Sequence, residues 1–139
     1  MSHRELLDLE IDSDLTRVAE TCRAWEQLAV ELALDAEAAA HIELALCEAV
    51  NNAIIHAYRR QPGYQVRVCV GQQGGRLIVA VVDYGAPMLG GLPQAEPLGS
   101  AGRRNEGGRG LGIIQSLMWD VTYRAGPDGN ALEMQYPLS

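Results

Sequence analysis

The chain has 139 residues, of which 47% are hydrophobic, and its formal net charge at pH 7 is -7. This length suits one hydrophobic core, so we expect a single domain over residues 1–139. All eleven basic residues are arginines, and nothing in this acidic composition indicates a broad nucleic-acid-binding surface. A protein partner or a small ligand is the better expectation.

No apolar run is long enough to span a bilayer, and the chain opens without a signal segment. We therefore expect a cytoplasmic protein with no membrane association. The three cysteines, Cys22, Cys47 and Cys69, form no C-x-x-C pair. Their odd number favours reduced thiols in a cytosolic protein, and we interpret all three as small, partly buried hydrophobic residues.

The first predicted elements are a strand and a helix. Apolar and acidic residues alternate over Leu7–Ile11, as in a strand with one buried face. Apolar residues then recur at helical spacing, which predicts an amphipathic helix over residues 14–33. Asp35 is suited to cap a second helix, which we expect Pro62–Gly63 to end.

The second helix carries a strip of polar side chains in an apolar sequence. Glu48, Asn52 and His56 recur every four residues, which places them on one helical face. The segment Leu44–Tyr58 is apolar nearly all round and should be buried. A buried carboxylate and amide must be hydrogen-bonded, paired or coordinated. The strip therefore faces a cleft or a ligand, or it is a polar seam satisfied by neighbouring backbone.

The second half of the chain predicts two hairpins with a loop and a helix between them. The first hairpin spans residues 64–82, and its second strand is almost wholly apolar. Residues 88–109 show no period, and so long a loop in a compact domain is usually functional, here a lid. A short helix over 111–118 precedes the second hairpin, residues 119–136, whose turn is 126–130.

The order of these elements decides the fold class. One strand and two helices are followed by two strands, the lid, a short helix and two more strands. Strands never alternate singly with helices, as they would in a βαβ series. We therefore predict an α+β fold, a two-layer sandwich of a mixed, mostly antiparallel sheet with its helices on one face.

Three distant segments offer complementary chemistry for a nucleotide. Glu48 and Asn52 supply a carboxylate and an amide oxygen, hard ligands that suit Mg²⁺ beside phosphates. The glycine-rich run Glu106–Gly112 precedes a helix, where backbone N–H groups can hold phosphate oxygens. Asp83, at a strand end before a glycine, can accept a hydrogen bond from an exocyclic amine. Each signal alone also has a purely structural explanation. An aspartate before a glycine often marks an ordinary turn, and a histidine such as His56 is more often a packed, hydrogen-bonded side chain than a ligand.

The joint order of these motifs resembles the histidine-kinase-like ATPase superfamily. E-x-x-x-N-x-x-x-H-A-Y over Glu48–Tyr58 matches its N box, D-x-G-x-P over Asp83–Pro87 its first glycine box, and G-x-G-L-G-I over Gly108–Ile113 its second. The resemblance extends over the chain from about residue 7 to residue 138. Within the superfamily the chain looks most like the small anti-sigma-factor serine kinases, which consist of the ATPase domain alone.

The resemblance implies a function and a set of roles. The protein would be an anti-sigma factor with ATP- and Mg²⁺-dependent serine/threonine kinase activity toward a small anti-anti-sigma antagonist, regulating transcription by partner switching. Related kinases suggest a homodimer. Glu48 would be the general base, Asn52 the Mg²⁺ ligand and Asp83 the adenine contact. The wider nucleotide-binding set would comprise His56, Gly85, Gly108, Gly110, Leu111 and Gly112.

The arginines and one departure from the family pattern complete these expectations. Arg109 is our candidate for countering charge on the γ-phosphate, with Arg103 and Arg104 as alternates. Gly129–Asn130 stands where many members carry Gly-Thr, which puts an adenine contact by that threonine in doubt. Asn130 can substitute for the threonine or simply occupy a turn, and we favour the turn.

Three alternatives to an anti-sigma kinase remain open. The first is a stoichiometric anti-sigma binder that uses nucleotide, or nothing, to order its lid and transfers no phosphate. The second is a related switch kinase that acts in a signalling complex without touching a sigma factor. The third is a structural domain with no ligand, and the three matched motifs argue against it.

Overall fold

The computed structural model of the chain describes residues 3–88 and 106–138. For residues 106–109 it describes the backbone but not the side chains. In these parts of the chain, the described strands form one five-stranded sheet, ordered β1-β2-β3-β5-β4, in which every neighbouring pair is antiparallel. The elements in chain order are β1 (His3–Asp12), η1 (Leu15–Arg17), α1 (Val18–Glu31), α2 (Ala36–Asn52), η2 (Ala53–Ala57), β2 (Gln65–Gln73), β3 (Arg76–Asp83), α3 (Glu106–Leu117), β4 (Trp119–Gly126) and β5 (Gly129–Pro137).

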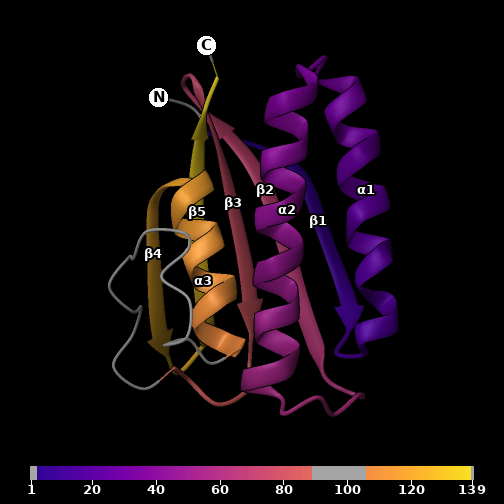
Figure 1. The fold of residues 1–139 in the computed structure, drawn as a ribbon, viewed down its shortest axis with the longest axis vertical. Coiled ribbons are helices and arrows are strands. Elements are labelled where there is room, and N and C mark those ends of the chain that lie inside the picture. Colours follow the sequence, from indigo (N-terminus) through magenta and orange to yellow (C-terminus); the bar gives the residue numbers. More distant parts are fainter. Residues whose placement is uncertain (1–2, 89–105, 139) are drawn as a thin grey trace.

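The three described α-helices cover one face of the sheet, with α2 between α1 and α3 (Figure 1). This arrangement confirms the predicted two-layer α+β fold. The sheet differs from the prediction in one respect, because its described strands are antiparallel throughout and not mixed. None of the described helices has the length and apolar character that crossing a membrane requires.

The core lies between the helices and the sheet. Alternate residues of β2 and β3 are buried, including Val66, Val68 and Val79, as their period-2 pattern predicts. From the other layer α2 contributes Ile42 and Leu46, which are fully buried. Burying one such side chain stabilises the fold by about 1.5–3 kcal/mol. The apolar face of α2 thus fixes this helix against the sheet.

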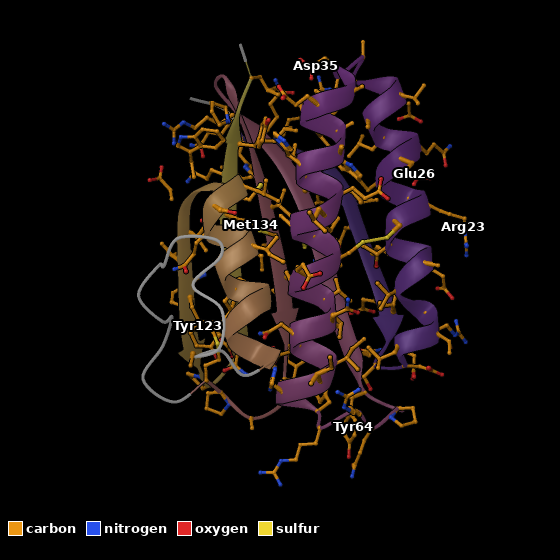
Figure 2. The ribbon with its side chains drawn as sticks, in the orientation of Figure 1. Arg23, Glu26, Asp35, Tyr64, Tyr123 and Met134 are labelled. Atoms are coloured by element: carbon orange, nitrogen blue, oxygen red, sulfur yellow. A yellow bond between two sulfur atoms is a disulfide. The ribbon has the colours of Figure 1, made fainter. Side chains whose placement is uncertain are left out.

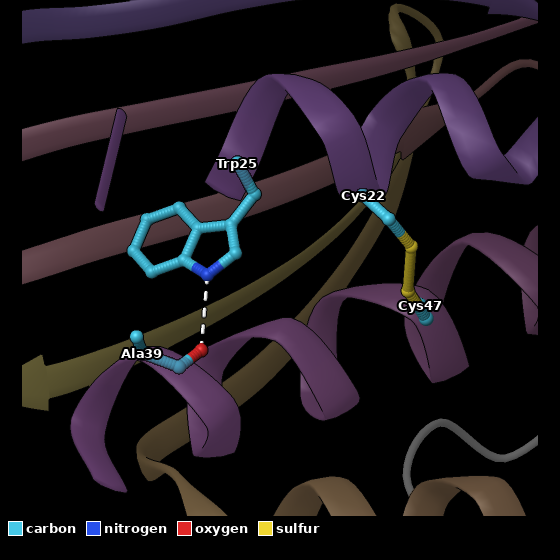
Figure 3. Close-up of a disulfide and its surroundings, with 4 residues drawn as sticks. All are labelled: Cys22, Trp25, Ala39 and Cys47. Carbon is cyan, nitrogen blue, oxygen red and sulfur yellow. Dashed lines mark hydrogen bonds between the residues drawn. A yellow bond between two sulfur atoms is a disulfide. The ribbon is translucent and has the colours of Figure 1, made fainter. Parts of the chain in front are cut away.

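Figure 3 shows two of the contacts that join α1 to α2. The fully buried indole of Trp25 donates its N–H to the carbonyl oxygen of Ala39 at 3.0 Å. A disulfide links Cys22 of α1 to Cys47 of α2. The expectation of reduced thiols is therefore wrong for this pair. Packing of neighbouring helices brings the two cysteines together, and their separation of 25 residues in sequence gives no signal of it.

Helix α2 begins as predicted but ends earlier. The Asp35 side chain accepts a hydrogen bond from the backbone N–H of Ala38 at 2.8 Å, which confirms the predicted N-cap. Figure 2 shows Asp35 at this end of the helix and Tyr64 beyond the other end. The α-helical pattern stops at Asn52, and Ala53–Ala57 forms a π-helical turn. The helical segment is therefore complete before Pro62–Gly63.

Helix α3 begins at Glu106, not at the predicted Leu111. The glycines of this segment thus lie inside the helix, which also includes residues 106–109 of the predicted lid. Residues 89–105, which make up most of that predicted lid, lie outside the described residues. Each glycine costs about 1 kcal/mol of helix propensity relative to alanine, so the sequence argued for a later start. Packing of α3 against α2 outweighs this preference.

Candidate functional site

A pocket lies where the end of α2 meets the sheet, and we call it the Asp83 pocket. Its lining comes from α2 and η2, from the end of β3 and the chain that follows, and from the strands β4 and β5. The polar and larger side chains among the lining residues are Asn52, His56, Asp83, Met88, Tyr123 and Leu132. Three of the predicted site residues, from two distant segments, therefore share one pocket.

Asp83 is the buried charge of this pocket, with only 8% of the residue exposed. Its Oδ1 accepts a hydrogen bond from the backbone N–H of Gly85 at 3.0 Å and another from Nδ2 of Asn130 at 2.8 Å. Burial raises the pKa of the Asp83 carboxyl, and these two hydrogen bonds oppose the rise. Both described hydrogen bonds use the same oxygen, so Oδ2 remains for a ligand.

Asn130 is a buried strand residue, so the favoured interpretation of it as a turn residue is wrong. The turn of the hairpin is Pro127–Asp128, and β5 has already begun at Gly129. Asn130 is paired directly with Asp83 across β5 and β3. An asparagine after a glycine is typical of turns, and only the register of the sheet reveals its partner. Sequence reasoning noted this position but missed its contact.

Tyr58 ties two strand ends to the helix and had no role assigned from the sequence. The residue is 7% exposed, and its hydroxyl donates to the carbonyl oxygen of Gln65 at 2.6 Å. The same hydroxyl accepts a hydrogen bond from the backbone N–H of Tyr84 at 2.7 Å. Tyr58 therefore positions the backbone that follows Asp83. The position of Tyr58 at the end of the N-box pattern is the feature of the sequence that could have indicated this role.

Gly85 lets the chain after Asp83 approach the end of α2. A Cβ atom at this position would collide with the carbonyl oxygen of Ala57 and lie 2.8 Å from its carbonyl carbon. The next residue, Ala86, donates its backbone N–H to that carbonyl oxygen at 3.0 Å. Gly85 is therefore needed here for close packing of two backbones. Gly85 itself does not line the Asp83 pocket, whereas the next residue, Ala86, does.

The polar strip of α2 is regular from Glu48 to Asn52 and crosses into the π-helical turn before His56. The turn is marked by a hydrogen bond from the N–H of Tyr58 to the carbonyl oxygen of Ala53 at 3.2 Å. A π-helical turn contains more residues than an α-helical one, yet Asn52 and His56 still line the same pocket. Asn52 is half-buried there and His56 is exposed.

Glu48 faces α3 and is not among the residues lining the Asp83 pocket. A Cβ atom at Gly110 would lie 3.0 Å from Oε1 of the half-buried Glu48 side chain. The absence of a side chain at Gly110 therefore leaves space for this carboxylate. The structure brings Glu48 to the second glycine segment, while Asn52 and His56 are brought to Asp83.

The remaining predicted residues lie on α3 or outside the described chain. A helix leaves the N–H groups of its first turn without intrahelical partners, and the first turn of α3 includes Gly108. Gly110 and Gly112 lie farther along the helix, and Leu111 is buried in the core. Arg109 is also in the first turn, but its side chain is not described. Arg103 and Arg104 lie outside the described residues.

The donor set suits a magnesium ion that arrives with phosphates. Among the described residues no group of three or more His, Cys, Asp or Glu side chains is arranged to hold a metal ion. Magnesium beside a nucleotide needs only one or two protein ligands, because phosphate oxygens and water supply the others. The half-buried amide of Asn52, which lines the Asp83 pocket, supplies one such ligand.

Comparisons with known proteins agree with this geometry. Residues 11–136 match the family model described as the histidine kinase-like ATPase domain. No curated protein matches the chain. Matches among solved structures include the RsbU and RsbW domains of Rv1364c from Mycobacterium tuberculosis, with a TM-score of 0.67 and 19% sequence identity. That match covers 95% of this chain and 32% of the other, and at this identity it shows a shared fold.

We predict that Gly85→Ala lowers the free energy of unfolding by about 1–3 kcal/mol, because the new methyl group overpacks against the Ala57 backbone. Chemical denaturation measures this change. Gly126→Ala is the matched control, since a Cβ atom there meets no heavy atom within 4 Å. Equal stability of Gly85→Ala and the control would show that the two backbones are not held in contact.

We predict that Asp83→Asn becomes more stable relative to the wild type as the pH rises. The native pKa of Asp83 lies above its ordinary value of 3.8, so the native state binds this proton more tightly than the unfolded state. Wild-type stability is therefore lost from about pH 3.8 upward, through the raised native pKa. The amide oxygen of the variant can still accept both hydrogen bonds. Denaturation of both proteins from pH 3 to 7 tests this, and a constant difference contradicts it.

Proposed function

Because the chain belongs to the histidine-kinase-like ATPase family, we propose that it binds ATP with Mg²⁺ and acts as an anti-sigma kinase. Its substrate is a serine or threonine of a small anti-anti-sigma antagonist. The family match supports nucleotide binding. The resemblance of the three sequence motifs to those of anti-sigma-factor serine kinases supports the partner-switching role.

The observation that carries the proposal is the arrangement of three candidate residues along α2 and the π-helical turn that follows it. Asn52 and His56 line a pocket with the buried acceptor Asp83, while Glu48 lies beside Gly110 of α3. The pocket thus offers an acceptor for a base. The first turn of α3 comes just before Gly110, which lies beside Glu48, and its N–H groups lack intrahelical partners and can hold phosphates. Both halves of a nucleotide have suitable chemistry here.

Each residue then has a role that follows from its chemistry. Asp83 accepts a hydrogen bond from the exocyclic amine of adenine through Oδ2. Asn52 would hold Mg²⁺, and the ion would neutralise charge on the phosphate oxygens. Glu48 takes the proton of the incoming hydroxyl as its oxygen bonds to the γ-phosphorus and the bond to the ADP oxygen breaks. Arg109 is the candidate for countering charge on the γ-phosphate.

We predict that Glu48→Gln keeps ATP affinity but lowers phosphate transfer to the antagonist by about 10²- to 10⁴-fold. The amide has the size of the carboxylate, so the contact with Gly110 is retained, but it cannot take up a proton. Transfer is measured with labelled ATP. Glu37→Gln, in the first turn of the same helix, is the matched control. Wild-type transfer by Glu48→Gln would exclude the general-base role, and a wild-type protein that transfers no phosphate would favour a stoichiometric binder.

The partners are tested by pull-down from the native cell with ATP, with ADP and without nucleotide. An anti-sigma kinase should capture a sigma subunit with ATP and retain the antagonist with ADP, because only the γ-phosphate distinguishes the two nucleotides. Added antagonist should release the sigma subunit. A switch kinase would give nucleotide-dependent capture of other proteins, and identical complexes in ATP and ADP would contradict nucleotide switching.

A further inference from the structure

We infer that Asn130 makes the Asp83 pocket selective for adenine over guanine by occupying one of the two carboxylate oxygens of Asp83. The inference rests on the proposed function, because it takes Asp83 as the contact for the base. Asn130 is then a specificity-determining residue that acts through Asp83.

The hydrogen bonds at Asp83 divide its two oxygens. A carboxylate oxygen has two lone pairs, and Oδ1 accepts from Nδ2 of Asn130 at 2.8 Å and from the N–H of Gly85 at 3.0 Å. Oδ1 is thereby filled. No hydrogen bond among the described residues uses Oδ2, so the carboxylate presents this one oxygen to a ligand in the pocket.

Asn130 is itself held from two sides. Its side-chain amide has two N–H bonds, and Nδ2 donates to Oδ1 of Asp83 and also to the carbonyl oxygen of Gly85 at 3.0 Å. Only 4% of the residue is exposed. Both donors of the amide are thus used within the protein, so none remains for the carbonyl group of a guanine.

The two purine bases make different demands on a carboxylate. Adenine carries one exocyclic amine next to a ring nitrogen that accepts, so a single free oxygen is sufficient. Guanine carries two adjacent donors, on N1 and N2, and binds a carboxylate well only when both oxygens are free. A carbonyl replaces the amine of adenine on the same edge of guanine. Occupation of Oδ1 thus selects against guanine, while adenine keeps its hydrogen bond.

The fold brings Asn130 to this position through the pairing of β3 with β5, in which Asp83 and Asn130 are direct partners. Gly129 makes the approach close, because its φ is +113° and a Cβ atom there would lie 2.9 Å from the carbonyl oxygen of Asp83. A threonine at position 130 has one hydroxyl donor and can replace one of the two amide hydrogen bonds. The second bond depends on asparagine.

The test compares ATP and GTP binding by calorimetry in the wild type, Asn130→Ala and Asn130→Thr. One net hydrogen bond corresponds to about a threefold to tenfold change in affinity. We expect Asn130→Ala to bind ATP about threefold more weakly and to lower the ratio of the GTP and ATP dissociation constants about tenfold. Asn130→Thr should give an intermediate ratio, because it restores one donor to Asp83.

Met134→Ala is the matched control for loss of stability, since Met134 is fully buried on β5 and pairs with Val79, four residues along the strands from the Asn130–Asp83 pair. It should leave the ratio unchanged. A wild-type ratio in folded Asn130→Ala would overturn the inference while leaving ATP binding intact. If Asn130→Ala does not fold, a wild-type ratio of the GTP and ATP dissociation constants in Asn130→Thr would overturn the inference instead. A wild-type protein that binds neither nucleotide would instead contradict the proposed function.

Discussion

The site depends on how a buried carboxylate is stabilised. A carboxylate as buried as that of Asp83 is costly unless hydrogen bonds replace its water, and here the two donors come from different segments of the chain. Gly85 lies on the chain that follows β3, and Asn130 lies on the neighbouring strand. The orientation of the carboxylate is therefore set jointly by the sheet register and by the backbone beyond the strand. A change in either would expose an unpaired charge in the pocket.

The end of α2 fixes that backbone in turn. The Tyr58 hydroxyl joins the start of β2 to the residue after β3, and the Ala57 carbonyl accepts from Ala86. These contacts come from the π-helical turn and the residue after it, so the irregular end of the helix is also the part that holds the site. π-Helical turns within longer helices are often found at functional sites. Local irregularity and the candidate site coincide here.

Features that depend on local pattern could be predicted from the sequence, and features that depend on pairing could not. The strand of Val66 and the cap at Asp35 follow from periodicity and side-chain chemistry. The role of Asn130 depends on the register of two strands, and its sequence context resembles a turn. The start of α3 was placed too late because glycine propensity opposes a helix that tertiary packing supports. The Cys22–Cys47 bond likewise arises only from helix packing.

The two ends of the site are connected by one rigid element. Glu48 and Asn52 are four residues apart on an α-helix, which sets a rise of about 6 Å between them. Asp83, the proposed acceptor for the nucleotide base, is held at one end, and Glu48, the proposed general base, meets α3 at the other. Because the side-chain amide of Asn130 bonds to Asp83 and Gly85, the proposed base selectivity and the proposed phosphate transfer rest on separate contacts. Substitutions can therefore alter one of these properties while the α2 scaffold preserves the other.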